Sequence, residues 1–353
     1  MARFLEERSA GLSGFAGKNS YGLTLHGQSE HFDELTDAFF ATLLKPTFEE
    51  KLLDQERELF YRSLEAVEED PLKQCFLAFQ DVIFKDHPYS LRGMGTKETL
   101  KKFTSSFLSQ RHAQTMQESK ILFTYMGNLP IEEVISLITP HLQDLKPRKE
   151  IKLSSQKILP AKKTTINKHF NREQSHIIMG KQAYNIFDDN DLPLKLLAAY
   201  LSGQGSPLFT KVRDEMGLCY AVRPIHLTAM EGGYFGIYIG SGKDKVQLAM
   251  KAINEILQNL KEKGLSKKDF NSVKKMMDGQ FQIGLETNED YAGQYSIFEF
   301  YNLGIDHYYD NHKKLMNITH EQFNKFLKKF INNDFFSVIA GPTSSDLHPQ
   351  QHC

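Results

Sequence analysis

The sequence has few cysteines, no long apolar run and almost no net charge. Its three cysteines, Cys75, Cys219 and Cys353, are widely scattered and have no Cys-x-x-Cys spacing. This pattern argues against a disulfide framework and a thiolate zinc site, and isolated cysteines are usually buried apolar fillers. No stretch of about 18 apolar residues is present, so no membrane-spanning helix is expected. The N-terminus Met1–Arg8 is charged where a signal peptide would turn apolar, so no export signal is expected either.

Acidic and basic residues are balanced. The 43 Lys and Arg against 44 Asp and Glu give a formal net charge of −1. This balance argues against nucleic acid as a partner, because a polyanion binds a surface with an excess of positive charge. A chain of 353 residues with 40% hydrophobic residues predicts two soluble globular domains, each with its own core. A periplasmic and a cytoplasmic location both stay open.

The stretch 205–222 is the most informative part of the sequence. It reads Gly-Ser-Pro-Leu-Phe-Thr-Lys-Val-Arg-Asp-Glu-Met-Gly-Leu-Cys-Tyr-Ala-Val, which predicts a helix over 209–215, a Gly-Leu turn and then a strand. The guanidinium of Arg213 and the phenol of Tyr220 would meet at this helix-to-strand corner, where they could hold a peptide carbonyl. Without that role, Arg213 would pair with neighbouring acidic residues and Tyr220 would end a core strand.

The sequence also contains an internal repeat with an offset of about 206–220 residues. Each copy has an alternating strand with a glycine exit, then an amphipathic helix, a His-containing loop and a closing strand. The clearest pairs are Tyr21–Ser29 with Tyr234–Gly242, Asp86–Tyr89 with Asp306–Tyr309, and Ile121–Gly127 with Phe335–Gly341. The repeat therefore predicts two copies of one α+β unit.

The two copies are unequal in length. The second opens with strands near Thr164–Phe170 and Ser175–Gln182, whereas the first has no counterpart to them, so about 50 residues of the first unit are missing. Such a unit exposes a sheet edge, so we expect a longer polypeptide or a partner to cover it. We place the first, N-terminally truncated domain at residues 1–145, a Lys/Pro/Ser-rich linker at 146–163, the second domain at 164–342 and a disordered tail at 343–353.

These features resemble the pitrilysin/insulinase family of metallopeptidases. The stretch 203–220 is similar to the family pattern Gly-x-x-Ser-x-Leu-Phe…Arg-Glu-x-x-Gly-Leu-x-Tyr, although Pro207 stands where the family often has Arg. Residues 61–64, followed by an acidic stretch and Pro71, are similar to the third domain of the four-domain members, and the second copy is similar to their fourth domain. The resemblance implies a fold of two repeated α/β sandwich domains of the LuxS/MPP-like type, from the metal-free half of the enzyme. It also implies that Arg213 and Tyr220 grip the substrate.

A metal site within this chain is not expected. The family's inverted motif His-x-x-Glu-His places both imidazoles on one helix face. Here His26 and His31 are one residue too far apart, and on a helix they would diverge by roughly 140°. The third-ligand position falls on Phe107 by spacing from His31, or on Ser63 by alignment of the matching helix, and neither side chain replaces a carboxylate.

The function implied by the resemblance is that of the metal-free half of a zinc metalloendopeptidase. This half would enclose a peptide or unfolded polypeptide for hydrolysis at a zinc site on another segment or subunit that carries His-x-x-Glu-His. The chain alone is expected to bind no cofactor and to be inactive, with no catalytic residues of its own. Two alternatives stay open. One is a structural or binding protein with the same fold, and the other is an autonomous hydrolase with an unrecognised site.

Three further features of the sequence have structural interpretations. The segment 232–238 is expected to be an aromatic strand of the sheet core, or alternatively an edge strand that extends a bound peptide. The aromatic residues between 298 and 309 are expected to form one packing cluster between the last helices. His87 and His307, at equivalent loop positions of the two copies, are expected to cap turns.

Overall fold

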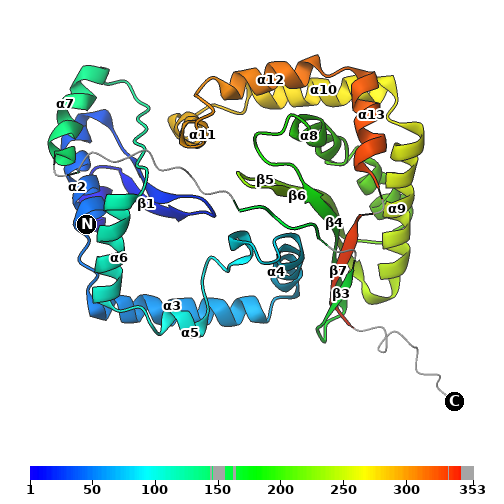
Figure 1. The fold of residues 1–353 in the computed structure, drawn as a ribbon, viewed down its shortest axis with the longest axis horizontal. Coiled ribbons are helices and arrows are strands. Elements are labelled where there is room, and N and C mark those ends of the chain that lie inside the picture. Colours follow the sequence, from blue (N-terminus) through cyan, green and yellow to red (C-terminus); the bar gives the residue numbers. More distant parts are fainter. Residues whose placement is uncertain (144, 146–155, 162–163, 333, 343–353) are drawn as a thin grey trace. The chain divides into compact units, whose positions relative to one another are not determined.

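The structure is a computed structural model that describes all residues except 144, 146–155, 162–163, 333 and 343–353. Its contacts divide the chain into two compact units. Unit 1 comprises Met1–Leu64, Arg92–Ser154 and Leu285–Ile305. Unit 2 comprises Glu65–Leu91, Ser155–Gly284 and Asp306–Cys353. Each unit is therefore built from both halves of the sequence (Figure 1).

Unit 2 contains a mixed five-stranded sheet in the order β3-β7-β4-β6-β5. Its strands are β3 (Thr165–His169), β4 (Gln174–Ala183), β5 (Ala221–Thr228), β6 (Gly233–Gly242) and β7 (Phe336–Gly341). Only β3 and β7 are parallel, and the other neighbours are antiparallel. All of the strands expected in the second copy are present. β6 is hydrogen-bonded to β4 and to β5, so the alternative of an edge strand at 232–238 is wrong.

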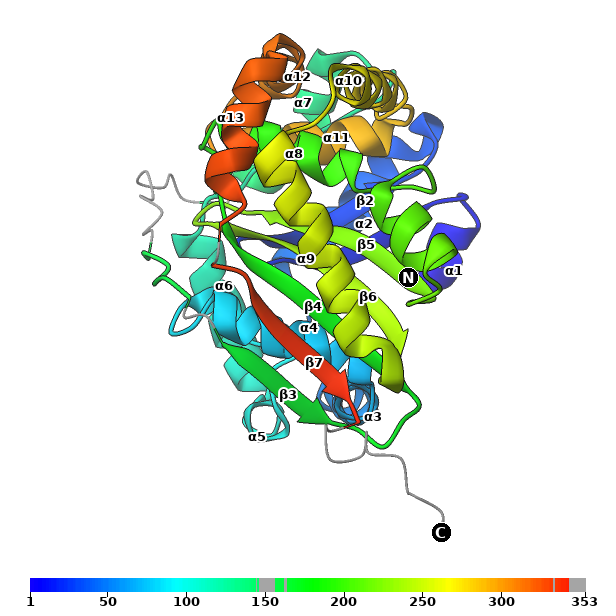
Figure 2. The same ribbon diagram turned by 90° about the vertical axis from the view of Figure 1, so that its right-hand side faces the viewer.

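Helices cover both faces of this sheet. Because successive strand residues point to opposite faces, Phe235 and Ile237 join one buried cluster while Tyr234 and Tyr238 join another. The first face carries the larger set of helices, with α9 in front of the strands in Figure 2. These are α8 (Asp191–Tyr200), η3 (Leu208–Glu215), η4 (Lys243–Lys245), α9 (Val246–Lys263), α10 (Lys267–Gln282), α12 (His307–Asn317) and α13 (His320–Phe330).

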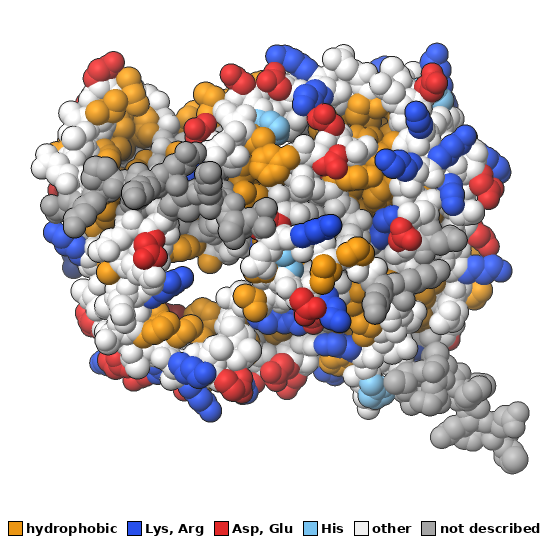
Figure 3. All heavy atoms as spheres, in the orientation of Figure 1, with side chains coloured by type: hydrophobic (Ala, Val, Ile, Leu, Met, Phe, Trp, Pro, Cys, Tyr) orange, Lys and Arg blue, Asp and Glu red, His pale blue; other side chains and the backbone are white. Residues whose placement is uncertain are grey.

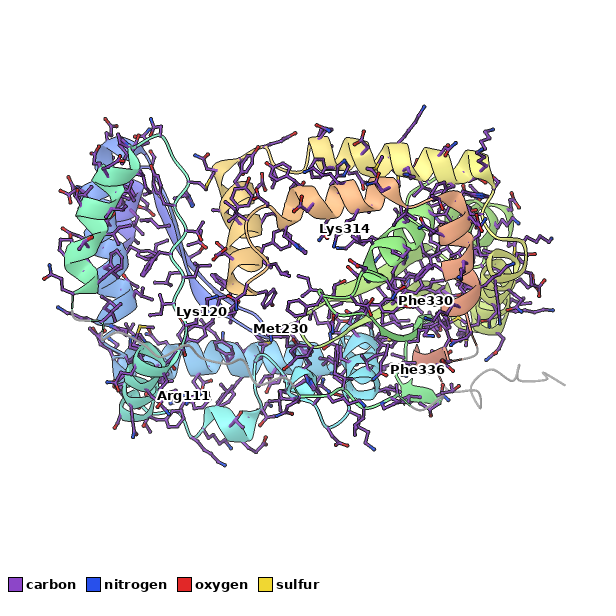
Figure 4. The ribbon with its side chains drawn as sticks, turned by 45° about the horizontal axis from the view of Figure 1, so that its top comes forward. Arg111, Lys120, Met230, Lys314, Phe330 and Phe336 are labelled. Atoms are coloured by element: carbon purple, nitrogen blue, oxygen red, sulfur yellow. The ribbon has the colours of Figure 1, made fainter. Side chains whose placement is uncertain are left out.

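The second face of the sheet is covered by α4 (Pro71–Ile83), which packs on β4 and β7. Asp70 caps its first turn by accepting from the backbone N–H of Lys73, and Pro71 fits the first helical position. Phe79 of α4 is fully buried, with its ring 5.1 Å from that of Phe336 and 5.2 Å from that of Tyr234. Phe336 is labelled at the start of β7 in Figure 4. Cys75 is also fully buried and burial raises the pKa of its thiol to about 12, which agrees with an apolar filler.

Unit 1 contains a two-stranded antiparallel sheet of β1 (Gly11–Ala16) and β2 (Tyr21–His26). Its helices are α1 (Ala2–Glu6), η1 (Ser29–His31), α2 (Phe32–Leu44), α3 (Glu50–Glu68), α5 (Lys97–Leu100), α6 (Ser105–Glu118), α7 (Ile131–Leu142) and α11 (Asn288–Phe300). The end of α3 belongs to unit 2, as does the short turn η2 (Pro88–Ser90). α11 is held in unit 1 by Lys120, whose amine donates to the carbonyls of Glu299 and Phe300, both at 3.1 Å.

The expected strand Ile121–Gly127 is wrong. In the described part of unit 1 this segment pairs with no strand, although Phe123 packs against Phe40 with ring centroids 5.2 Å apart. Its counterpart in the repeat, β7, lies between β3 and β4 and pairs with both. Unit 1 has no described strands in the places of β3 and β4, so the segment has no partners for a ladder.

The aromatic residues expected to cluster at 298–309 are divided between the two units. Phe300 and Tyr301 contact each other in unit 1, with ring centroids 5.7 Å apart. Tyr308 and Tyr309 lie in unit 2, where Tyr308 stacks on Phe281 at 4.7 Å.

The fold is a mixed α/β arrangement, but the finer divisions made from the sequence stay predictions. The boundary between domains 1–145 and 164–342 follows the repeat, whereas the contacts place α4 with the second sheet and α11 with unit 1. Most of the expected linker 146–163 lies outside the described residues, and Gln156–Ala161 forms no helix or strand. The expected tail 343–353 lies wholly outside them.

Candidate functional site

The stretch 205–222 forms a helix, a turn and a strand, as predicted. Leu208 and Val212 of η3 are fully buried in the core of unit 2 and fix this helix on the sheet. η3 is wider than an α-helix, since the N–H of Met216 donates to the carbonyl of Lys211 at 3.0 Å. Gly217 then turns the chain with φ of 58°, a conformation that suits glycine.

Arg213 lies on the exposed side of η3. Its guanidinium carbon is 4.5 Å from the centre of the Phe209 ring, which is a cation–π contact. Arg213, Asp214 and Glu215 all belong to the described residues, and no ion pair or hydrogen bond joins the arginine to either acid. The expected pairing with neighbouring acidic residues is therefore not found. Burial raises the pKa of the Cys219 thiol to about 11, and the nearby charge of Arg213 partly opposes that shift. Because Arg213 pairs with neither acid, the N–H donors of its guanidinium can bind another ligand.

Tyr220 lies directly before β5 and is held by the sheet. Its N–H donates to the carbonyl of Gly240 at 3.0 Å, and its ring covers the Gly240 backbone. A Cβ added to Gly240 would lie 2.4 Å from Cζ of Tyr220 and 2.5 Å from its hydroxyl oxygen. The side chain stays 44% exposed. The phenol is thus accessible to a ligand while its ring position is fixed.

Tyr238 and His176 lie beside Tyr220 on the α4 face of the sheet. Tyr238 is two residues from Gly240 on β6 and is 5% exposed. Its hydroxyl lies 2.8 Å from Nδ1 of His176 on β4. Arg223 of β5 lies 5.5 Å above the Tyr238 ring. Sequence reasoning missed this group, although the alternation along β6 places Tyr238 and Gly240 on one face.

The polar groups of this site have shifted acidities. Burial is the largest cause that raises the pKa of Tyr238 well above its ordinary value, and the Tyr220 hydroxyl adds to it. Burial also lowers the pKa of His176, and the Asp70 carboxylate partly opposes that shift. Both side chains are therefore uncharged near neutral pH and act as hydrogen-bonding groups.

Arg213 and Tyr220 flank the same turn but are not bonded to each other. In the described structure Arg213 contacts Phe209 and Tyr220 contacts Gly240, with no hydrogen bond between the two side chains. Both sequence-predicted residues thus belong to one helix-to-strand corner. Their role in substrate binding stays a prediction.

No group of three or more His, Cys, Asp or Glu side chains that could hold a metal ion occurs among the described residues. His26 ends β2, and His31 lies in η1 at 3.8 Å from Glu30. Ser63 is exposed on α3 and Phe107 is 45% exposed on α6. The two histidines therefore do not share a helix face.

His87 caps a turn, as expected, because its Nδ1 accepts from the N–H of Tyr89 at 3.1 Å. His307 instead begins α12 and its Nε2 lies 2.6 Å from the amide nitrogen of Asn311. Lys/Arg and Asp/Glu side chains are interspersed over the face drawn in Figure 3. None of the helices in the described part of the chain has the length and apolar character needed to cross a membrane.

The sheet with helices on both faces defines a mixed α/β protein. A family model described as the peptidase M16 inactive domain matches residues 102–277. The chain belongs to this peptidase family, and the resemblance seen in the sequence is confirmed.

Proteins with related sequences are named as zinc proteases or as homologues of them. An uncharacterized zinc protease, YmxG of Bacillus subtilis, is 25% identical over 256 residues, which cover 72% of this chain and 61% of the relative. A non-peptidase homolog YmxG of Helicobacter pylori is 21% identical over 361 residues, covering 96% of this chain and 79% of the relative. The chain spans about three fifths of the length of the first curated relatives that it matches.

Solved structures share the fold. The M16 inactive-domain protein of Pseudomonas fluorescens superposes with a TM-score of 0.85 at 20% identity, covering 97% of this chain and 83% of that one. A protease of Helicobacter pylori gives a TM-score of 0.83 at 15% identity, covering 96% and 84%. At these identities the likeness shows a common fold.

Proposed function

We propose that this chain is the metal-free part of an M16 zinc metalloendopeptidase, and that it binds peptide for hydrolysis at a zinc site on another segment or subunit. The observation that carries the proposal is the corner at 213–220. There an unpaired guanidinium and a fixed, 44% exposed phenol lie on either side of one turn. A surface of this kind offers hydrogen-bond donors to an uncharged acceptor.

The chemistry of the two side chains suits a peptide carbonyl. Arg213 presents a planar fork of donors, and Tyr220 presents one hydroxyl. A carbonyl oxygen has two lone pairs and can accept from both. As water adds to that carbonyl, charge grows on the oxygen, and donors placed for the oxyanion stabilise it more than the ground state. The corner would in this way support a reaction whose metal and general base lie elsewhere.

Catalysis elsewhere is supported by two findings. The family model that matches the chain is that of an inactive domain, and the described residues hold no metal-binding cluster. The zinc and its His-x-x-Glu-His ligands would then belong to a catalytic half on the same or another polypeptide. The peptide or unfolded polypeptide would be enclosed between the two parts.

We further propose that residues 1–145 are the first copy of the repeat and that other residues supply its opening strands. Helices α4 and α11 hold the same place in the two copies, directly after α3 and α10. Each is assigned to the unit that is formed mainly by the other copy, and this correspondence supports the repeat. The two-stranded sheet of unit 1 supports the missing strands, because two strands alone are marginally stable.

The proposal is tested by peptide binding. A fluorescein-labelled unfolded casein peptide is titrated with the chain, and the dissociation constant is read from fluorescence anisotropy. Arg213→Ala is expected to weaken binding roughly tenfold to a hundredfold, and Tyr220→Phe roughly two- to tenfold, because a charged and a neutral hydrogen bond are lost. Arg172→Ala, an exposed arginine in the turn between β3 and β4, is the matched control. Equal binding by all four proteins would overturn the proposal.

A structural or binding role without proteolysis is the second candidate. The relative that covers 96% of this chain is named a non-peptidase homolog, which favours it. The two candidates differ when a catalytic partner is present. Arg213→Ala lowers the rate of peptide cleavage if the chain takes part in proteolysis, and leaves it unchanged if the chain has only a structural role. Chelator-insensitive cleavage by the chain alone would contradict both.

A further inference from the structure

Arg223 is a second exposed arginine close to Tyr220. It lies on β5, the strand at one end of the five-stranded order. Its guanidinium carbon is 5.5 Å from the centre of the Tyr238 ring, which is a cation–π contact. Among the residues that the structure describes, no acidic side chain pairs with Arg223 and no acceptor takes a hydrogen bond from it. The candidate site therefore has a further cation whose donors can bind a ligand.

The register of the sheet places Arg223 and Tyr220 on the same face. Paired residues of antiparallel strands point to one face, and so do residues two apart on one strand. Arg223 pairs with Tyr238, which is two residues from Gly240 on β6. A Cβ at Gly240 would lie 2.4 Å from Cζ of Tyr220, so the Tyr220 ring lies on the face to which Tyr238 points. The two side chains thus lie over positions of β6 that are about 7 Å apart along the strand.

This end of the face is accessible. α4 packs on β3, β4 and β7, toward the other end of the strand order. Arg223 is exposed and Tyr220 is 44% exposed, whereas Tyr238 between them is 5% exposed. The buried Tyr238 ring limits where the guanidinium lies, and N–H donors directed away from that ring face a ligand.

We propose that Arg223 is a specificity-determining residue, which binds a carboxylate of the peptide one or two residues from the carbonyl held by Tyr220. The inference rests on the proposed function and adds to it a substrate class, namely peptides with an acidic group near the bound carbonyl. The carboxylate belongs to an Asp or Glu side chain or to the C-terminus of the peptide.

The spacing and the chemistry both suit such a ligand. In an extended peptide, residues two apart lie on one side at a separation of about 7 Å, which matches the spacing of the two contacts on β6. A guanidinium binds a carboxylate through two parallel N–H···O bonds. A glutamine or asparagine amide has one oxygen and no charge, so it makes a weaker contact with the same fork.

The proposal is tested with a short peptide that carries fluorescein at its N-terminus, glutamine at every second position and an amidated C-terminus. A second peptide has glutamate in place of each glutamine, and a third keeps the glutamines but ends in a free carboxylate. In fluorescence anisotropy at low salt, the parent chain is expected to bind the glutamate peptide roughly three- to tenfold more tightly than the amidated glutamine peptide. The reason is that a charge-assisted hydrogen bond replaces a neutral one.

Variants assign the preference to its residue. Arg223→Gln removes the charge and is expected to bind the three peptides alike. Arg172→Gln, in the exposed turn between β3 and β4, removes the same charge elsewhere and should keep the preference of the parent chain. A preference for the third peptide that Arg223→Gln abolishes would assign the carboxylate to the end of the substrate chain. The inference is wrong if the parent chain prefers neither carboxylate peptide, or if Arg223→Gln retains the preference.

The inference and the proposed function fail in different ways. Arg213→Ala should weaken the binding of all three peptides by the same factor, because the backbone carbonyl is common to them. If it does so while Arg223→Gln keeps the preference, the carboxylate assignment alone is wrong. If Arg213→Ala and Tyr220→Phe both bind every peptide as the parent chain does, the proposed function is wrong, and with it the placement of the carboxylate beside a bound carbonyl. Thermal midpoints of the variants show whether the fold is intact.

Discussion

Unit 1 and unit 2 have related sequence patterns but very different cores. In unit 2, both buried clusters are built on the two faces of the five-stranded sheet. In the described part of unit 1 the sheet has two strands, and its buried apolar side chains are few. They are Leu35, Phe40, Leu100, Val134 and Phe298. Amphipathic patterns alone therefore do not make a core, because each apolar face needs an opposing layer to bury it.

The helices α4 and α11 show the same difference locally. Cys75, Phe79 and Ile83 of α4 are each fully buried against β4 and β7. On α11, Phe298 is the most buried residue at 9% exposed, and Ser296 contacts the unpaired segment 121–126 through the Thr124 hydroxyl at 2.7 Å. The burial of a helix is thus decided by the number of strands beneath it.

The largest expected effect concerns the aromatic contacts of these two helices. Phe79→Ala should lower the free energy of unfolding of unit 2 by about 3–5 kcal/mol, because a fully buried ring is lost and leaves a cavity. Phe298→Ala should cost less, since its site is less enclosed. Urea unfolding followed by amide NMR signals of each unit measures both values. Similar losses would show that the core of unit 1 is as well packed as that of unit 2.

Glycine-to-alanine changes give a second contrast between the sheets. A Cβ at Gly180 of β4 would lie 2.6 Å from the Phe79 ring and 2.8 Å from the carbonyl of Phe235. Gly180→Ala should therefore destabilise unit 2 by about 1–3 kcal/mol through overpacking. At Gly14 of β1 the nearest atoms are 3.8 Å away, so Gly14→Ala should change stability by less than about 0.5 kcal/mol. Thermal midpoints of the two variants test this, and a large loss at Gly14 would reveal a hidden packing layer in unit 1.

Low pH should lower the free energy of unfolding of unit 2, because it protonates the Asp191 carboxylate. This 3% exposed carboxylate accepts from Thr228 at 2.7 Å, contacts His226 at 2.9 Å and pairs with Lys195 at 3.0 Å. Burial opposes its ionisation, but His226, Lys195 and Thr228 together hold the pKa of Asp191 below its ordinary value. Because the folded-state pKa lies below the unfolded one, the stabilisation is fully present above the unfolded pKa of about 3.9 and is lost as pH falls through the folded pKa.

Urea midpoints between pH 6 and pH 3 measure this loss. The fall in stability of unit 2 should be smaller in Asp191→Asn than in the parent chain, because the variant has no carboxylate to protonate. The exposed Asp290 of the α11 capping box is the matched position in unit 1, and hydrogen bonds from Thr287 lower its pKa too. Asp290→Asn should leave the acid response of unit 2 unchanged. An equal effect of both variants would contradict an origin in unit 2.

The smallest expected effect concerns lysines that cap helix C-termini. Lys181, whose side chain is 11% exposed, donates to the Phe330 carbonyl at the end of α13 at 3.2 Å. Phe330 is labelled on α13 in Figure 4. Lys120 makes the equivalent contacts to α11 in unit 1. Lys181→Met should cost about 1 kcal/mol, since carbonyls lose a charged donor near the helix end. Lys120→Met should lower the free energy of unfolding by less, because the contacts of Lys120 are more exposed to solvent. Calorimetric midpoints of both variants measure the losses, and a larger loss in Lys120→Met would contradict this expectation.

Several elements were predictable from local pattern. The alternation of 234–242 predicted β6. The spacing of apolar residues in 208–215, followed by Gly217, predicted a helix and its turn where η3 lies. The site residues Arg213 and Tyr220 were found in the same way, because a helix followed by a glycine turn and a strand is a local structure. Tyr238 and His176 were not found, since they reach Tyr220 only through strand pairing across β4, β6 and β5.

Local sequence pattern was enough to predict the strands of unit 2, the corner that carries Arg213 and Tyr220, and membership of the family. Tertiary structure alone decided that residues 121–126 remain outside any ladder, that α4 covers the second sheet and that the Tyr220 ring lies on Gly240. The difference arises from the distance along the chain over which each kind of interaction acts. Turns, caps and periodicity act between near neighbours, whereas a strand needs partners and a side chain needs a surface that distant residues provide.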